Sequence, residues 1–324
     1  MKKVNVAILG TGVIANKLAK AFSITENANL YAVASRDKGN ACVFAEKHGI
    51  AKAYGSYKDA IGDPFVDLIY IALPHPLHYT WAKEALLCGK NVLCEKPLCV
   101  NSRQAEELFT IAKEKGLFFS EAMWTRFLPV VKTVKKLIDD GEVGNIKKIN
   151  ALIAHDSTKV YRMTDPSLAG GILLDCGVYL ITSVFLLMGD EYSHIKTKAR
   201  LSKKGVDLHS LTCLTYPDQS VAKLFMAMNI RLGNKIKIIG TKGTITMNTV
   251  YNWQNVTLKN SKGKQKIAIP QQRAGGFEYM TEGVCNAILQ GKKYCDELTP
   301  ADTLSVMQLM DSLREKWNLK YPCE

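Results

Sequence analysis

The chain has 324 residues, of which 47% are hydrophobic and 23% charged, and its net charge is +13. This composition suits a soluble globular protein of about two domains. Because no run of eighteen apolar residues occurs, we expect no membrane span. Nine dispersed cysteines without a CxxC pair or zinc spacing fit reduced thiols, so we expect a cytoplasmic protein without a metal.

The positive charge raises nucleic acid as a partner. Many of the lysines stand in pairs or alternate with polar residues, as in "KNSKGKQK" at 259–266. Alternating lysines are typical of a solvated edge strand that resists aggregation, and no nucleic-acid motif accompanies them. We therefore expect no nucleic-acid partner, although a positive field can also attract an anionic cofactor.

The first 120 residues alternate strands with helices. Apolar runs predict strands over 4–10, 29–35, 66–74, 91–97 and 117–122. The stretches between them predict helices over 12–23, 37–49, 76–89 and 101–116. Continuous apolar strands separated by helices indicate a parallel sheet that is covered on both faces. We predict an α/β fold with a doubly wound Rossmann domain in residues 1–121.

The rhythm changes after residue 122. Helices are predicted over 128–141, from near Gly171, and over 302–317. Period-two alternation predicts strands over 209–217, 220–230, 235–241 and 243–248. This pattern indicates an α+β domain in residues 122–324 with a large open, mostly antiparallel sheet. A ligand cleft is expected between two such domains.

A glycine-rich turn, "GTGVIA", follows the first strand. Gly10 permits the tight turn, Gly12 lets the backbone approach a pyrophosphate, and Ala15 permits close packing of helix on strand. The free N–H groups at the start of a helix favour an anion. We expect a dinucleotide to contact the whole turn, which comprises Gly10, Thr11, Gly12, Val13, Ile14 and Ala15.

The end of the second strand indicates which nucleotide binds. NAD-binding versions usually carry an acidic residue there, whereas this chain has Ser35 and Arg36. An arginine can bind a 2′-phosphate in bidentate fashion, so we predict NADP as the cofactor, with NAD as the alternative. Asp37 is predicted to cap the following helix.

Two further strand ends carry unusual side chains. "ALPHPLH" places Leu73, His75 and His78 after one strand, and "CEKP" places Glu95 and Lys96 after the next. The carboxyl ends of Rossmann strands face the nicotinamide, so we expect these five residues near the cofactor. Pro97 restricts Lys96 to an extended backbone, which fixes where its ammonium points. A structural ion pair is the alternative interpretation, but it leaves the rigid proline unexplained.

Three motifs give the chain a family resemblance. "GTGVIA", "GKNVLCEKPL" and "GGILLDCGVY" occur in the order typical of the Gfo/Idh/MocA family of NAD(P)-dependent oxidoreductases, which the whole chain resembles. With "CEKPL", the segment "EAMWTRFLP" resembles the branch containing dimeric dihydrodiol dehydrogenase and NADP-dependent D-xylose dehydrogenase. The resemblance implies a substrate-binding and oligomerising second domain, a homodimer or larger assembly, and Trp124 and Arg126 near nicotinamide and substrate.

The resemblance also implies that Lys96, Asp175 and Tyr179 surround the reacting carbon. Asp175 and Tyr179 are four residues apart, which places them on one helix face. Free tyrosine has a pKa near 10 and is a weak base at neutral pH unless a nearby ammonium lowers that value. We assign Tyr179 as general acid/base, Lys96 as its activator and Asp175 as the orienting residue. Lys96 as the proton carrier is the alternative.

Further side chains are expected to line the substrate pocket. Arg162 precedes the catalytic helix, and Trp253 and Phe277 offer aromatic surface, although aromatic residues often serve packing. Aromatic lining suits a cyclic diol or the apolar face of a sugar. We predict an oxidoreductase that moves a hydride between the cofactor and a carbinol of a polyol, sugar or cyclic diol. The alternatives are a regulator that binds NADP without turnover and an enzyme that uses the cofactor transiently in sugar bond cleavage.

Overall fold

The computed structural model describes residues 2–324 and contains two compact units. The first unit comprises the chain up to Phe127 together with Gln272–Leu304, and the second comprises Leu128–Gln271 with Ser305–Glu324. A late segment of the chain therefore returns to the N-terminal unit. The functional boundary between residues 121 and 122 stays a prediction.

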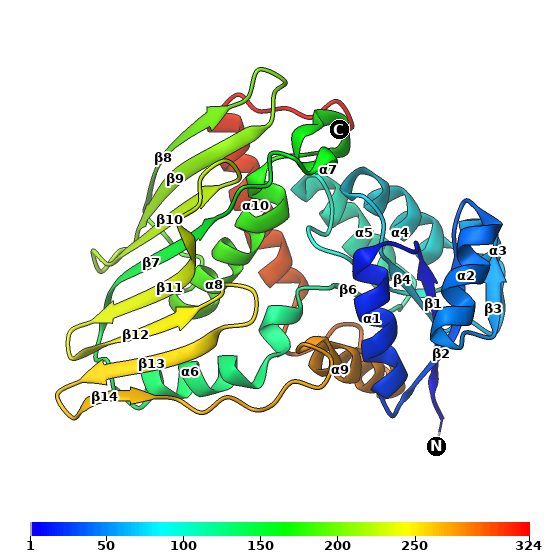
Figure 1. Ribbon diagram of the computed structural model, residues 1–324, viewed down its shortest axis with the longest axis horizontal. Helices are drawn as coiled ribbons and strands as arrows, with labels where there is room; N and C mark the ends of the chain where they lie inside the picture. The colour runs from blue at the N-terminus through cyan, green and yellow to red at the C-terminus, as the bar shows by residue number, and fades with distance from the viewer. Residues whose placement is uncertain (1) are drawn as a thin grey trace. The chain divides into compact units, whose positions relative to one another are not determined.

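The first unit is built on a parallel sheet of six strands in the order β3-β2-β1-β4-β5-β6 (Figure 1). The strands are β1 (Val4–Leu9), β2 (Ala28–Ala34), β3 (Lys52–Tyr54), β4 (Leu68–Ile71), β5 (Asn91–Cys94) and β6 (Phe119–Glu121). The order reverses between β1 and β4, as in doubly wound dinucleotide-binding sheets. The predicted Rossmann sheet is confirmed, and only the three-residue β3 lacks a counterpart among the predicted strands.

Local sequence explains where the helices of this unit begin. They are α1 (Val13–Ile24), α2 (Lys38–His48), α3 (Tyr57–Gly62), α4 (His78–Leu87), α5 (Ser102–Glu114) and α9 (Phe277–Leu289). Asp37 caps α2 by accepting the Asn40 N–H at 3.0 Å, which confirms the predicted cap. Asn101 caps α5 in the same way through Gln104. The unpredicted α9 packs beside α1 (Figure 1).

The second unit contains an eight-stranded sheet in the order β14-β13-β12-β11-β7-β10-β9-β8. Its strands are β7 (Ile146–Ala154), β8 (His194–Leu201), β9 (Asp207–Thr215), β10 (Val221–Ala227), β11 (Gly233–Gly240), β12 (Gly243–Asn248), β13 (Gln254–Asn260) and β14 (Gly263–Lys266). The β10–β7 pair is parallel and the other pairs are antiparallel, which confirms the predicted sheet. The lysine-rich stretch forms the β13–β14 hairpin, and β14 is the exposed edge.

The helices of the second unit carry its apolar core. They are α6 (Pro129–Asp139), α7 (Tyr161–Thr164), α8 (Val178–Met188) and most of α10 (Pro300–Lys316), with a π-helical segment at Leu173–Gly177. Pro166–Met188 is the one segment of the described chain that is long and apolar enough to cross a membrane, but 72% of its most apolar window is buried inside the structure. Such burial is typical of a core helix, and α8 packs on β7 and β10.

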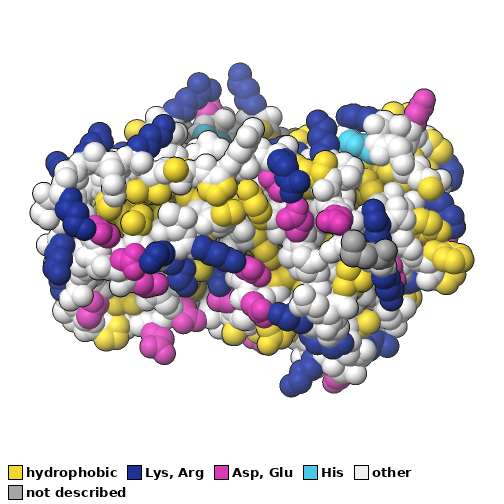
Figure 2. All heavy atoms as spheres, turned by 90° about the horizontal axis from the view of Figure 1, so that it is seen from below, with side chains coloured by type: hydrophobic (Ala, Val, Ile, Leu, Met, Phe, Trp, Pro, Cys, Tyr) yellow, Lys and Arg dark blue, Asp and Glu magenta, His cyan; other side chains and the backbone are white. Residues whose placement is uncertain are grey.

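The charged side chains mix on the surface that Figure 2 shows. Lys and Arg side chains are spread among acidic and uncharged ones over this face. Within the second unit, exposed lysines lie on β14 at Lys264 and Lys266, where they guard the sheet edge.

Trp253 allows a test of what its indole does. Its side chain is 0% exposed, and Nε1 donates to Ser183 Oγ of α8 at 3.4 Å. Because truncation would leave a large cavity, we expect Trp253→Ala to lower the free energy of unfolding by about 3–5 kcal/mol in urea titrations followed by circular dichroism. Leu232→Ala, at a side chain that is 60% exposed, is the control and should change it by less than about 0.5 kcal/mol. Full stability with lost substrate affinity would instead support the predicted substrate contact, which this packing disfavours.

Candidate active site

The glycine turn between β1 and α1 has the geometry of an anion cradle. Gly10 has φ +104°, and a Cβ there would lie 2.5 Å from the Ala72 carbonyl oxygen. At Gly12, by contrast, no atom of residues 2–324 beyond its chain neighbours and its own helix backbone lies within 4 Å of where a Cβ would stand. Gly12 is the N-cap of α1, and no acidic residue stands in the first turn, whose N–H groups favour an anion. Val13 beside it is 79% exposed. These features fit a dinucleotide pyrophosphate.

At the end of β2, the Arg36 side chain lies near the buried Tyr57. Ser35 is buried and its Oγ accepts the Asp37 N–H at 3.3 Å, whereas Arg36 is exposed. Burial raises the pKa of Tyr57, and the neighbouring Arg36 guanidinium opposes that rise. Arg36 therefore lies near the Tyr57 hydroxyl, and its exposed charge is available to an anion from solvent.

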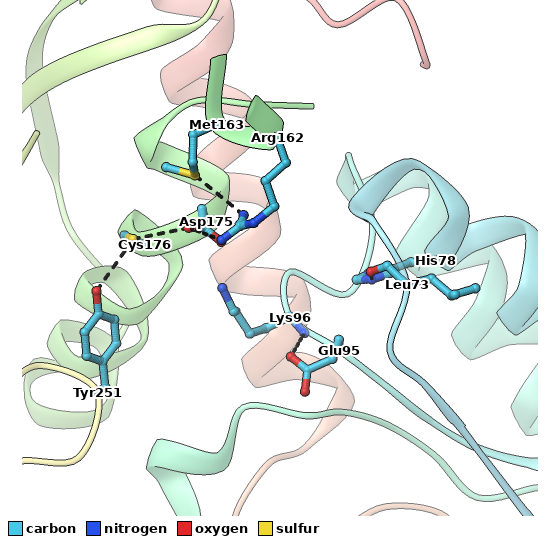
Figure 3. A network of polar contacts seen from close by, with 9 residues as sticks. All are labelled: Leu73, His78, Glu95, Lys96, Arg162, Met163, Asp175, Cys176 and Tyr251. Atoms are coloured by element: carbon cyan, nitrogen blue, oxygen red, sulfur yellow. Dashed lines mark hydrogen bonds and ion pairs between the residues drawn. The ribbon is translucent and has the colours of Figure 1, made fainter. Parts of the chain in front are cut away.

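At the end of β5, Glu95 is anchored into the sheet. Its carboxylate accepts the Tyr70 hydroxyl at 2.6 Å and the Lys96 backbone N–H at 3.2 Å (Figure 3). The Glu95 N–H in turn donates to the Ile71 carbonyl at 3.0 Å, and the Lys96–Pro97 peptide bond is cis. Glu95 thus fixes the backbone from which the Lys96 side chain projects. Its predicted contact with the cofactor stays a prediction.

His78 ties two strand ends together. The ring is fully buried, with Nδ1 2.9 Å from the Pro97 carbonyl and Nε2 2.8 Å from the Leu73 carbonyl (Figure 3). Burial lowers the pKa of His78, the two carbonyls oppose this, and the Lys96 charge lowers it further. The His75 ring lies 5.8 Å away, at the start of a short 3₁₀ turn. His78 therefore holds the chain after Lys96 in place, and its predicted contact with the cofactor stays a prediction.

Residues after β6 bring two predicted aromatic residues together. Trp124 stacks on Phe277 of α9 with ring centroids 4.3 Å apart, although the two are far apart in sequence. Arg126 donates from Nε to the Glu297 carbonyl at 2.6 Å and pairs with Asp302 at 2.9 Å. Trp124 and Phe277 thus form one buried aromatic pair. Arg126 binds the returning segment of the chain through Glu297 and Asp302.

In the second unit, Arg162 and Asp175 form a bidentate ion pair. Its Nη1 and Nη2 donate to the two carboxylate oxygens at 2.8 and 3.1 Å (Figure 3). Asp175 lies on the π-helical segment and its side chain is 12% exposed, against 51% for Arg162. Burial alone would lower the pKa of Arg162, but Asp175 raises it and the net shift is upward. Single π-turns often mark functional positions, and here the turn carries a carboxylate held in one orientation.

Tyr179 follows in the first turn of α8. It is buried and meets Tyr251 edge-on, with centroids 4.9 Å apart and ring planes at 86°. The Tyr251 hydroxyl lies 3.7 Å from Cys176 Sγ, and burial raises the pKa of Tyr251 well above its usual value. Tyr251 was missed by the sequence analysis because an isolated aromatic residue in a loop gives no signal of what it contacts.

A buried carboxyl supports the start of the π-helical segment. Asp207, the first residue of β9, accepts the Leu173 N–H at 2.8 Å through Oδ2, and Oδ1 has no hydrogen-bond partner within the described chain. Burial raises the pKa of Asp207 to about 7, opposed by backbone N–H donors and Arg314. Oδ1 also fills the space beside Gly171 that a Cβ would need.

The comparisons with known proteins agree with this geometry. The profile of the oxidoreductase family with an NAD-binding Rossmann fold matches residues 4–123, and the GFO/IDH/MocA C-terminal domain matches residues 131–246. The trans-1,2-dihydrobenzene-1,2-diol dehydrogenase of Xenopus tropicalis is 32% identical over 325 residues, covering 97% of this chain and 98% of the relative. The Bos taurus enzyme of that name is 38% identical over 213 residues, covering 65% and 64%.

Solved structures extend the match. A 3-ketoreductase from Actinomadura kijaniata, in complex with NADP and TDP-benzene, superimposes with a TM-score of 0.88 at 26% identity, covering 97% of this chain and 98% of the other. Levoglucosan dehydrogenase in complex with NADH reaches 0.87 at 20% identity, covering 97% and 96%, which shows the shared fold.

A Rossmann sheet with an open glycine cradle and an appended, mostly antiparallel sheet is the arrangement that this family of nicotinamide-dependent oxidoreductases shares. The chain belongs to the Gfo/Idh/MocA oxidoreductase family. The predicted family, its dihydrodiol dehydrogenase branch and the prediction of an NAD(P)-dependent enzyme acting on CH–OH groups are confirmed. Among residues 2–324, no group of three or more His, Cys, Asp or Glu could hold a metal ion.

The raised pKa of Asp207 predicts a specific pH dependence of stability. Because the folded protein binds this proton more tightly than the unfolded chain, the stabilisation is complete below about pH 4 and is lost as pH rises through about 7. We expect the free energy of unfolding to fall by roughly 2 kcal/mol more in the wild type than in Asp207→Asn between pH 5 and pH 8. Urea titrations at each pH measure the difference, and parallel curves for the two proteins would contradict it.

Proposed function

We propose that the protein oxidises a carbinol of a sugar or cyclic diol with NADP as the preferred hydride acceptor. The observation that carries the proposal is the position of Lys96, which leaves the carboxyl end of β5 on a backbone fixed by Glu95 and His78. In a doubly wound sheet this edge faces the nicotinamide. When bound, the cofactor supplies the hydride-accepting carbon.

Residues of the chain transfer the proton and orient the substrate. The Lys96 ammonium stabilises Tyr179 as a phenolate and binds the substrate oxygen. As the carbinol is oxidised, this phenolate takes the hydroxyl proton and becomes a neutral phenol. Asp175 orients the substrate hydroxyls, with Arg162 holding its two oxygens. In this proposal Lys96, Asp175 and Tyr179 are the catalytic residues.

Two observations support the proposed substrate class: the names of the relatives and the stacked aromatic pair Trp124–Phe277. The curated relatives are named for a cyclic diol, and the A. kijaniata ketoreductase was solved with TDP-benzene. Trp124 and Phe277 are buried and stack on each other, and flat aromatic rings of this kind suit a cyclic diol or a sugar ring.

The assembly and the location of the protein are also proposed. The homodimer or larger assembly implied by the family is tested by light scattering after gel filtration, where a monomer mass would refute it. A cytoplasmic location agrees with nine free cysteine thiols, and localisation of the tagged protein by cell fractionation tests it.

Substitutions at the proposed catalytic residues separate the two candidates for the proton carrier. We expect Tyr179→Phe to lower kcat by about 10²-fold or more, because proton transfer by a positioned group contributes about that factor. Lys96→Met should lower kcat as well, with NADPH binding retained. The measurement is NADPH production with a panel of sugars and cyclic diols.

Other outcomes would redirect the assignment. Near-normal kcat in Tyr179→Phe beside an inactive Lys96→Met would make Lys96 the proton carrier. NADPH binding without turnover of any substrate would favour the regulator, and product formation without NADPH release would favour transient use of the cofactor.

The choice of cofactor is tested at Arg36. A titration followed by nicotinamide fluorescence should show tighter binding of NADPH than of NADH. Arg36→Ala should weaken NADPH binding by about tenfold or more, which corresponds to one charge-assisted phosphate contact, and leave NADH binding within about twofold. Lys38→Ala is a nearby control, because its ammonium donates to the Ala53 carbonyl. Preferential NADH binding by the wild type would refute the proposed NADP preference.

A further inference from the structure

Glu121 is a buried carboxyl that the proposed mechanism does not use. It is the last residue of β6, paired in register with Cys94 of β5, and it is 2% exposed. Oε1 accepts the Leu98 N–H at 3.1 Å, and Oε2 accepts the Thr303 hydroxyl of α10 at 3.3 Å. Glu121 therefore ties β6 and α10 to the segment that carries Lys96.

The surroundings of Glu121 make its charge responsive to Lys96. Burial raises the pKa of Glu121 to about 7; the Leu98 and Thr303 donors and the Lys96 charge oppose the rise, and the Glu95 charge adds to it. Two buried carboxyls thus lie at adjacent strand ends: Glu121 ends β6, and Glu95 directly follows β5 and precedes Lys96.

The other titratable groups packed here contribute little net charge. Burial raises the pKa of the Cys94 and Cys99 thiols well above the usual value, and burial lowers the pKa of His78, so all three are neutral near pH 7. On the neighbouring 3₁₀ turn and on α10, Arg126 and Asp302 form an ion pair with each other. Two charges act on the pKa of Glu121: the Lys96 ammonium lowers it and the Glu95 carboxylate raises it.

We propose that Glu121 is a positioning residue for Lys96. Glu121 fixes the Lys96–Leu98 segment by accepting the Leu98 N–H, and it exchanges a proton that changes the charge near the lysine. The proposal rests on the proposed function in that Lys96 serves the reaction. When the proton leaves, a second carboxylate supports the Lys96 ammonium. When it is bound, that support is withdrawn while the backbone anchor remains. Because coupling between two titrating groups is reciprocal, each group also shifts the titration of the other.

The coupling is tested without cofactor or substrate. In protein labelled with ¹³Cδ-glutamate, the Glu121 carboxyl signal is assigned by its loss in Glu121→Gln and is followed by NMR from pH 5 to pH 9. We expect a midpoint near neutral in the wild type and a rise of about half a pH unit or more in Lys96→Met, where the stabilising cation is gone. Glu114→Gln, at an exposed position on α5, controls for global effects of charge removal and should leave the midpoint unchanged. A midpoint in the ordinary range of glutamate, or one that ignores Lys96→Met, overturns the proposal.

The functional consequence is read from the pH profile of kcat/KM. We expect the wild-type kcat/KM to change in a step near pH 7, where Glu121 loses its proton. Glu121→Gln keeps an acceptor for the Leu98 N–H and removes only the charge, so the variant should fold and its pH profile should lack this step. Thr303→Val removes the weaker hydrogen bond, keeps the carboxyl and should keep that step. An unchanged profile in Glu121→Gln overturns the proposal. Failure of the proposed function is distinguishable, because it would appear as an active Lys96→Met enzyme while the NMR coupling persists.

Discussion

The first unit depends on how its parallel sheet accommodates carboxylates at the ends of adjacent strands. Removing a carboxylate from water costs several kcal/mol unless donors replace the lost hydration. Glu95 obtains its donors from the Tyr70 hydroxyl and the Lys96 N–H, and Glu121 obtains its donors from Leu98 and Thr303. Because two of these donors are the backbone N–H groups of Lys96 and Leu98, satisfying the carboxylates also immobilises the lysine's backbone.

The second unit solves the same problem around its own carboxylate. Asp175 would be free to turn on an ordinary helix surface, but Arg162 holds both of its oxygens and Asp207 holds the start of the π-helical segment through Leu173. The two buried carboxyls Glu121 and Asp207 therefore play equivalent parts. Each accepts a backbone N–H two residues from a proposed catalytic residue, and each binds its own proton more tightly than an exposed carboxyl does.

The sequence predicts the parts of this arrangement that depend on local pattern. Apolar runs revealed the central strands of the first sheet, and the unusual charges after β5 identified Glu95 and Lys96. β3 was not predicted because a three-residue strand is too short to show a pattern. β8 was not predicted either, although its alternating lysines are the pattern of an edge strand. The return of α9 to the first unit, and with it the stacking of Phe277 on Trp124, depends on contacts between distant segments that no local pattern encodes.

Contacts between distant segments also explain why some candidate residues have packing contacts that the sequence does not reveal. Trp253 and His78 belong to residue types that often line sites, and only tertiary packing shows that the indole fills a core and the imidazole joins two carbonyls. Glu121 carried the opposite signal, since a single acidic residue at the end of an apolar strand resembles the point where the strand meets water. Its burial becomes understandable once β5 and α10 are in place, because they supply the donors. Residues that tune a site from behind it are therefore harder to predict than those that face the substrate, since their partners come from elements remote in the chain.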